Sequence, residues 1–441
     1  MKDTLTNPEE LASSEQMKTY LRRCRKAALA ESNPTEHDIE RGLEIHRNTI
    51  VCDLLGGGRA DGLYSPPMYN YMRKRLSQYQ TSELDVPVST RYGTTGKIAS
   101  KIREEIESLW PHSKELGRNP DLQADHQAIM AATGKTMYAT GSEGVEGLAS
   151  FNHFFDEANY VSKIVRIDQI EELKARGEWG ILYHLHNGVK LREESEDMLD
   201  DMELYYRMGV RWSMLWGPGF GGRQWEPELG LTDRGRQAVQ RMNELNIIVD
   251  TSHCGPKTSL QMIEESQQPV IVSHVGCKAV HPGYCSGRNI TDESMKAVAE
   301  KGGIVGISTI FTLLGENSID MLMRHIDHAA RLIGTDHIGL GSDHGVNLNL
   351  ELPEMVQALK PKQWNTAYPW NLTSETRSQH AHMENANEVN WKIYTSPHAL
   401  SECAWPYNVT IPLVQRGYSD IEIQNMLGGN FLRVARNILQ G

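Results

Sequence analysis

Four short apolar segments of this chain end in histidine or aspartate, the side chains that bind metal ions and transfer protons. They are LYHLH, ending at His186, DTSH at His253, VSH at His274 and GSD at Asp343. Imidazole is a preferred ligand of zinc, and a carboxylate beside a reacting water can act as a general base. Three imidazoles and one carboxylate suffice for an open catalytic metal site, where a bound water has a pKa of about 7.

Each of these residues also has an ordinary explanation, because a single histidine at a strand end is more often a hydrogen-bonded structural residue. The prediction of a metal site rests on three histidines from successive strands. His184 faces the same way as His186 but lies one pleat deeper, where it could be a core residue or contact substrate. Structural or loop roles are expected for four other histidines: His325, His328, His380 and His382.

Two further residues are candidates for binding substrate. Arg288, in CSGRNITD, follows a strand, and it could make a surface or capping contact or clamp a substrate carboxylate through two parallel hydrogen bonds. The sequence leaves both roles open. Trp216 lies in a loop after another strand and is expected to form part of the pocket wall.

The elements that must position these residues alternate regularly from residue 160 onward. Six helix–strand units follow a first apolar strand, IVCDLL at 50–55. Alternation of this kind predicts either a doubly wound sheet or a closed (β/α)8 barrel. Polar residues end five different strands, and only a barrel brings so many strand ends to one mouth, so we expect a TIM barrel of the metallo-dependent hydrolase type. These residues are Asp53, His186, His253, His274 and Asp343.

The chain divides into three predicted regions. Residues 1–48 form a helical segment that packs on the barrel, 49–400 form the barrel with an irregular insertion at about 56–98, and 401–441 form a C-terminal helical segment. The second barrel strand has two candidates, at 86–90 and 136–141. Thr232 and Ser419 are expected to cap helices, and Gly428–Gly429 to break the C-terminal helical segment, which as a whole would pack on the barrel exterior.

Composition narrows the class of protein. The chain has 441 residues, of which 39% are hydrophobic and 23% charged, as in an ordinary globular protein. Its net charge of −12 argues against nucleic acids and anionic membranes as partners. No apolar run approaches the ~20 residues of a membrane span, and we see no secretory signal. The six cysteines are scattered without a CxxC pair, as in a reducing compartment, so a cytoplasmic location is expected.

Five separated blocks resemble one known family. GLTDRGRQAVQRMNELNIIVDTSH, PVIVSHVGCKAV, GRNITDESMKAVAEKGGIVGI, HIDHAARLIGTDHIGLGSD and RGYSDIEIQNMLGGNFLRV are similar to the renal (membrane) dipeptidase family, peptidase family M19, from about residue 165 to the C-terminus. The resemblance implies a (β/α)8 barrel, cleavage of dipeptides, two zinc ions bridged by a glutamate, and a homodimer. It also implies that His253 and His274 bind zinc, that Arg288 holds the substrate carboxylate and that Asp343 is catalytic.

The chain departs from the family pattern at other positions. Leu55 and Gly57 stand where the family has the His-x-Asp ligands of its first zinc, and His186 stands where it has the bridging glutamate. Trp216 and Gly217 stand where it has a substrate-binding histidine. We therefore expect one ion per chain, zinc or another divalent metal, bound by His186, His253 and His274, with Asp343 as a further ligand or as the base.

Three functions remain open from the sequence. The first is a metal-dependent hydrolase of a dipeptide-like or amide substrate, in a homo-oligomer. The second is a lyase, tautomerase or other isomerase, since an acid–base pair at a barrel mouth can move protons without adding water. The third is a non-catalytic paralogue, which the lost ligands would suggest and the retained Arg288 and Asp343 argue against.

Overall fold

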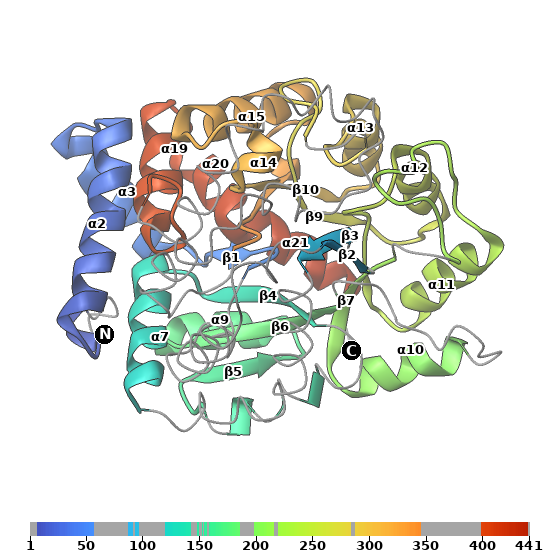
Figure 1. Cartoon of the computed structure of the whole chain (residues 1–441), viewed down its shortest axis with the longest axis horizontal. Helices are drawn as coiled ribbons and strands as arrows, with labels where there is room; N and C mark the ends of the chain where they lie inside the picture. Colours follow the sequence, from blue (N-terminus) through green and yellow to red (C-terminus); the bar gives the residue numbers. More distant parts are fainter. Residues whose placement is uncertain are drawn as a thin grey trace.

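The computed structural model describes most of the chain: residues 7–56, 87–90, 93–96, 120–142, 148–149, 152, 154–156, 158–185, 198–215, 219–283, 287–344 and 398–439. Eight parallel strands follow one another in a single sheet (Figure 1). In order they are β1 (Cys52–Asp53), β4 (Met137–Ser142), β6 (Trp179–Leu185), β7 (Val210–Met214), β8 (Ile248–Asp250), β9 (Ile271–Val275), β10 (Ile304–Ser308) and β11 (Ile338–Gly341).

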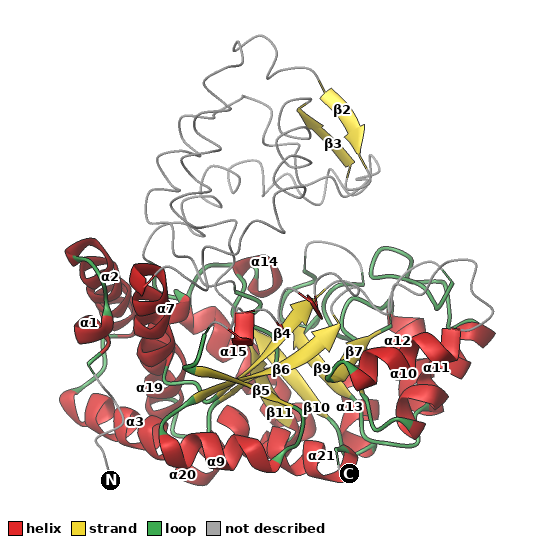
Figure 2. Cartoon of the chain, turned by 90° about the horizontal axis from the view of Figure 1, so that it is seen from below, coloured by secondary structure: helices red, strands yellow, loops and turns green. Residues whose placement is uncertain are grey.

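Helices surround this sheet and cover its outer face (Figure 2). Those between the strands are α7 (Pro120–Thr133), α9 (Asp168–Arg176), α10 (Met198–Arg207), α11 (Asp233–Glu244), α12 (Pro256–Glu265), α13 (Asp292–Glu300), α14 (Phe311–Leu314) and α15 (Ile319–Ile333). The N-terminal helices are α1 (Pro8–Leu11), α2 (Glu15–Ser32) and α3 (Glu36–Asn48), and the C-terminal ones are α19 (Ile411–Gln415), α20 (Asp420–Gln424) and α21 (Asn430–Ile438). The predicted (β/α)8 barrel is confirmed.

The second strand of the barrel is β4, the later of its two sequence candidates. The earlier candidate forms β2 (Pro87–Thr90), which pairs antiparallel with β3 (Gly93–Gly96) in a separate two-stranded sheet. A short strand that was not predicted, β5 (Val161–Ile164), pairs with β6 beside the barrel path. The remainder of the expected insertion at 56–98 lies outside the described residues.

Two predicted caps are present. The Thr232 side chain accepts a hydrogen bond from the Gly235 N–H at the start of α11, and Ser419 forms a capping box with Glu422 at the start of α20. The predicted helix break at Gly428–Gly429 is wrong, because a π-helical turn (Asn425–Gly429) carries the helix on into α21. A side chain at Gly428 would begin 2.1 Å from the Ile50 carbonyl oxygen, so this glycine allows close packing on the chain before β1.

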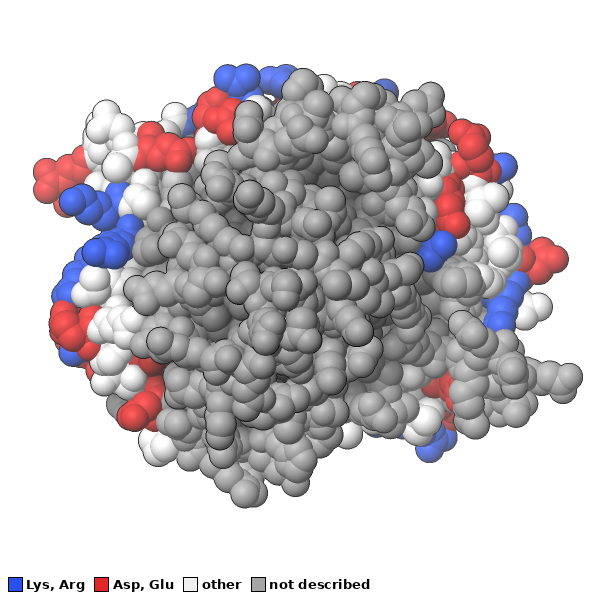
Figure 3. Space-filling view, in the orientation of Figure 1, with Lys and Arg blue, Asp and Glu red and all other residues white. Residues whose placement is uncertain are grey.

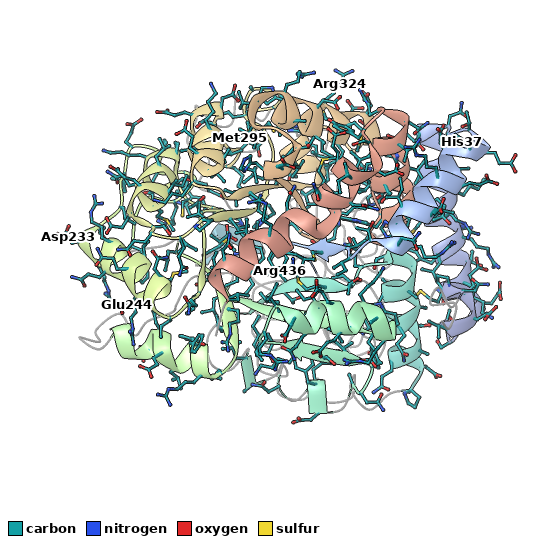
Figure 4. All side chains as sticks on the ribbon, turned by 180° about the vertical axis from the view of Figure 1, so that it is seen from behind. His37, Asp233, Glu244, Met295, Arg324 and Arg436 are labelled. Atoms are coloured by element: carbon teal, nitrogen blue, oxygen red, sulfur yellow. The ribbon has the colours of Figure 1, made fainter. Side chains whose placement is uncertain are left out.

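The C-terminal segment was expected to pack on the barrel exterior, but its last helix, α21, packs across one open end of the barrel. Figure 4 shows α21, which carries the labelled Arg436, crossing this end. Phe431 stacks on Trp212 of β7 with ring centroids 5.6 Å apart, and both belong to a buried cluster with Ile248, Ile271 and Ile304. Alternate residues of the same strands, such as Val249 and Val272, belong to the cluster that faces the helices.

The barrel closes between β1 and β11 through a seam of few hydrogen bonds. The Leu54 N–H donates to the Leu340 carbonyl at 2.9 Å. Asp53 strengthens the seam, because its carboxylate accepts hydrogen bonds from the Ser342 N–H at 2.8 Å and from the Ser342 hydroxyl at 2.6 Å. A side chain of β1 therefore fixes the turn that follows β11.

A buried cation neutralises this carboxylate. The Lys135 ammonium lies 2.6 Å from Asp53 Oδ2, also pairs with Glu402, and lies 3.6 Å from the centre of the Trp405 ring. Lys135 and Asp53 have fully buried side chains. Burial raises the pKa of Glu402 to about 7, and the charge of Lys135 opposes that rise.

The outer surface mixes both signs of charge, and the face in Figure 3 shows acidic and basic side chains interspersed around its rim. Within the described residues, no helix has the length and apolar character that crossing a membrane requires. Five cysteines in these segments are buried and free: Cys24, Cys52, Cys254, Cys277 and Cys403.

We predict that Lys135→Met destabilises the protein by about 3–5 kcal/mol at pH 8, because it leaves two buried carboxylates without their cation. Without the ammonium, the pKa of Glu402 rises further above its usual value of 4.5, so the folded state binds more protons than the unfolded state. The stability of the variant should then fall as pH rises from about 5 to 8. Urea unfolding midpoints measure this, with exposed Lys257→Met as the matched control. Equal midpoints for both variants at pH 8 would contradict the role given to Lys135.

Candidate metal and substrate site

Four of the residues singled out from the sequence meet at the carboxyl ends of the strands. His253 follows β8, His274 lies in β9, Arg288 follows β9 in the chain, and Asp343 follows β11. The predicted site residues His186 and Trp216 lie outside the described residues, as do His380 and His382.

The rings of His253 and His274 converge on one point. Their Nε2 atoms are 2.9 Å apart, and the ring centroids are separated by 4.9 Å. Each Nδ1 has its own partner: that of His253 lies 2.9 Å from Gln224 Oε1, and that of His274 lies 2.8 Å from Ser273 Oγ. Because an amide oxygen can only accept, His253 donates from Nδ1, and its Nε2 carries a lone pair when the ring is neutral.

His253 has a backbone conformation that side chains rarely adopt. Its φ is +65°, in the left-handed region. That conformation costs an ordinary residue about 1 kcal/mol or more. The segment after β7 holds it in place, because the Gln224 N–H donates to the His253 carbonyl at 2.9 Å. Gln224 thus contacts both the backbone and the ring of His253.

Asp343 lies next to the two imidazoles and is also left-handed, with φ of +54°. Its Oδ2 is 3.7 Å from His274 Nε2, and its N–H donates to the Leu55 carbonyl at 2.7 Å. Burial raises the pKa of Asp343 to about 7, and the positive charge of Arg288 opposes part of that rise. The hydrogen bond between Leu55 and Asp343 at the seam therefore places the carboxyl group of Asp343 at the mouth of the barrel.

Arg288 is nearly fully buried, with 2% of its surface exposed, so a surface role is excluded. Its Nη1 donates to the His274 carbonyl at 3.0 Å, and its Nε has no hydrogen-bond partner among the described residues. With His253 it lines a cavity of about 20 Å³, room for about one water molecule. A buried guanidinium with an unused donor is suited to bind an anionic group of a ligand.

His184 lies below this group of residues, inside the barrel. It is fully buried, its Nε2 lies 3.0 Å from Asp250 Oδ2, and its ring meets Trp212 edge to face at 5.3 Å. The structure thus separates His184 from the histidines at the mouth. Burial raises the pKa of Asp250, but hydrogen bonds from His184, Ser273 and Ser252 outweigh it and leave the pKa below its usual value.

The histidine pair can supply two of the nitrogen ligands of a divalent ion. Two nitrogens that bind one tetrahedral zinc ion at about 2.0–2.1 Å are about 3.3 Å apart. The observed separation of 2.9 Å is that of a hydrogen bond between the two rings, and a movement of about 0.4 Å would bring the nitrogens to the spacing of zinc ligands. An oxygen partner on the opposite ring nitrogen is characteristic of metal-binding histidines. Within the described segments, no group of three or more His, Cys, Asp or Glu side chains is arranged to hold a metal ion. The described residues therefore fit a metal as two of its ligands, with Asp343 adjacent.

Several contributors to the site were not among the residues predicted for it. Asp250 could have been included, because, like Asp53, it is an aspartate at the end of an apolar strand. Gln224 had no such signal, because its role depends on how the loop after β7 folds over His253.

The expected structural role of His325 agrees with its contacts, since it is fully buried and forms hydrogen bonds with the Cys277 N–H and the Leu314 carbonyl.

Comparisons with known proteins agree with this architecture. The chain is 27% identical over 213 residues to a protein of Claviceps purpurea (strain 20.1) described as dipeptidase tcpJ, a match that covers 47% of this chain and 39% of that protein. The chain thus spans about two fifths of the length of this curated relative. Among solved structures, an amidohydrolase from Pseudomonas aeruginosa superimposes with a TM-score of 0.60 at 21% identity, covering 90% of this chain and 99% of that one.

A metallopeptidase from Rhodobacter sphaeroides, solved with a phosphinate mimic of the dipeptide L-Ala-D-Ala, superimposes with a TM-score of 0.54 at 17% identity. That match covers 89% of this chain and all of the other. At these identities the two structures support the fold. The model of the membrane dipeptidase family matches residues 140–368, just over half of the chain. Together with the barrel and the residues at its mouth, this match shows that the chain belongs to the membrane dipeptidase family, peptidase family M19.

Proposed function

We propose that this protein is a metal-dependent hydrolase that cleaves the amide bond of a dipeptide or a dipeptide-like small molecule. The observation that carries the proposal is the convergence of the His253 and His274 Nε2 atoms, 2.9 Å apart, beside Asp343 and Arg288. Family membership supports it, and the Rhodobacter relative binds a mimic of the dipeptide L-Ala-D-Ala.

We assign His253 and His274 as ligands of one zinc ion, with His186 as the third ligand expected from the sequence. A bound divalent ion would supply a water of pKa about 7 and polarise the substrate carbonyl. The restriction to a single ion is supported by Leu55, which stands where the family resemblance predicts a ligand of another ion. Leu55 is apolar and only 4% exposed, so it can contribute no donor atom from its side chain.

Asp343 is proposed as the general base. Its carboxylate reaches the space beside His274 Nε2, where the attacking water would lie, and its backbone is fixed by the Leu55 carbonyl. A neighbouring cation favours the ionised form of a carboxyl group, and that form can accept a proton. The proton can then pass to the leaving amine as the amide bond breaks.

Arg288 is proposed to bind the carboxylate of the substrate. Its buried Nε is a charged donor without a protein partner among the described residues, and a carboxylate supplies the acceptor it needs. The same guanidinium donates a hydrogen bond to the His274 carbonyl. The group proposed to bind the substrate is therefore fixed directly to a residue proposed to bind the metal. A homo-oligomer and a cytoplasmic location also stay predictions, which light scattering and cell fractionation would check.

Removing the metal should abolish hydrolysis, and zinc should restore it. We predict that His253→Ala and His274→Ala each lower metal affinity at least tenfold and kcat/KM on an L,D-dipeptide by about 100-fold or more, because each loses an inner ligand. Metal content by elemental analysis and turnover before and after chelation measure both effects. His328→Gln serves as the control, because it changes a histidine that pairs with Asp292 on the outer helices. This variant should retain the metal affinity and the kcat/KM of the parent protein.

The source of the oxygen in the product distinguishes hydrolysis from proton transfer alone. Reaction in heavy-oxygen water should place the label in the new carboxylate. An unlabelled product, or full turnover by a metal-free preparation, would refute the hydrolase proposal and favour the lyase or isomerase alternative.

Replacing Arg288 should selectively lower kcat/KM for substrates that carry a free carboxylate. We predict that Arg288→Lys lowers kcat/KM for a dipeptide by roughly 30-fold, equivalent to about 2 kcal/mol, because it loses the planar pair of donors. The corresponding dipeptide amide should lose much less. Kinetics on both substrates measure the difference, and metal content checks that His274 is undisturbed. An equal loss on both substrates would argue against carboxylate binding by Arg288.

A further inference from the structure

We propose that Asp250 is the positioning residue of this site: its single buried carboxylate fixes the turn that leads to His253 and the strand segment that carries His274, and so sets the affinity of the two histidines for a metal ion. This inference rests on the proposed function, because it assumes that the two histidines bind a metal. It adds a residue that touches neither metal nor substrate.

The first of the two segments is the turn that leads to His253. The Ser252 N–H donates to Asp250 Oδ1 at 2.8 Å. This is a local turn in which a side chain replaces a backbone acceptor. The next residue is His253, with its left-handed backbone. A strained residue persists only when its surroundings hold it, and the hydrogen bond to Ser252 supplies that restraint on the N-terminal side.

The second segment is part of the neighbouring strand, since Ser273 and His274 are consecutive residues of β9. The same oxygen of Asp250 accepts the Ser273 N–H at 3.2 Å, and the Ser273 hydroxyl lies 2.8 Å from Nδ1 of the His274 ring. The hydroxyls of Ser252 and Ser273 are 3.1 Å apart, and the His274 N–H donates to Ser252 Oγ at 3.3 Å. One carboxylate oxygen thus joins the residues immediately before both histidines, so the spacing of the two rings depends on it.

The other oxygen anchors Asp250 to the barrel interior. Oδ2 accepts a hydrogen bond from His184 Nε2 at 3.0 Å, and the His184 ring packs against Trp212, which stacks on Phe431 of the closing helix. Both side chains of the His184–Asp250 pair are fully buried. The carboxylate is therefore held from below by packed rings and cannot shift without moving the core.

The cost of burying this carboxylate suggests that it does more than stabilise the fold. A buried carboxylate is unfavourable unless it is paired or fully hydrogen-bonded. Within the described residues, Asp250 forms its salt bridge with His184 and not with a lysine or arginine. Its negative charge below two histidines would, in addition, favour a cation bound between them.

The test compares metal affinity with stability in the full-length chain. Parent, Asp250→Asn, His253→Ala and His325→Gln are stripped with chelator, and the dissociation constant for Zn²⁺ is measured by competition with a chromophoric chelator. Visible absorption of the Co²⁺-loaded proteins reports the geometry around the ion, and melting of the metal-free proteins reports stability. His325→Gln is the matched control, because His325 is also fully buried but forms its hydrogen bonds with the Cys277 N–H and the Leu314 carbonyl and not with Ser252 or Ser273.

We expect Asp250→Asn to weaken Zn²⁺ binding about 10- to 100-fold and to change the Co²⁺ spectrum, as loss of an outer partner of metal ligands does. His325→Gln should lower the melting temperature and leave both metal readouts at parent values. If Asp250→Asn binds Zn²⁺ as tightly as the parent protein while His253→Ala binds it more weakly, the positioning role of Asp250 is overturned and the metal site stands. Parent affinity in His253→Ala would overturn the proposed metal site, and this inference with it.

A pair of milder variants tests the same network if Asp250→Asn does not fold. Ser273→Ala keeps the carboxylate and removes only the hydroxyl that contacts the His274 ring, so it should weaken Zn²⁺ binding several-fold. Ser273→Thr restores the hydroxyl and should return the affinity to near the parent value. Equal affinities for the alanine and threonine variants would contradict the network.

Discussion

Closure of a parallel barrel requires its last strand to pair with its first, and in this protein the pairing depends on the carboxylate of Asp53. β1 is only two residues long, so its backbone offers few hydrogen bonds to β11. Asp53 supplies two more by accepting the N–H and hydroxyl of Ser342. Asp343 is the next residue, so the closure of the barrel and the position of the proposed base have one physical cause.

The same arrangement recurs on the opposite side of the mouth. Asp250, like Asp53, ends a strand and accepts hydrogen bonds from backbone N–H groups just before residues of the site. In both places the next residue, His253 or Asp343, is held at positive φ. Each left-handed residue costs about 1–3 kcal/mol, and it is restrained by the carboxylate below it together with one backbone hydrogen bond, to Gln224 at His253 and to Leu55 at Asp343.

The two carboxylates differ in how their charge is balanced, and this separates structural from functional roles. Asp53 has a buried ammonium, Lys135, which also pairs with Glu402 and so joins β1 to the C-terminal segment. Asp250 has an imidazole, His184, and the site above it is where a cation would bind. The charge of the first pair is balanced within the protein, whereas the second pair lies below the proposed metal site.

The sequence by itself determined the barrel, the second strand to within two candidates, and the strand-end residues His253, His274 and Asp343, because period, length and polarity are local properties of a segment. It could not place Gln224, Lys135 or Glu402, whose roles depend on partners 29 to 267 residues away. Nor could it show that Gly428 serves close packing or that α21 closes the barrel, since both depend on surfaces that exist only after folding. Tertiary structure also decided the role of His184, because only the packed interior brings β6 and β8 together and places its ring against Asp250.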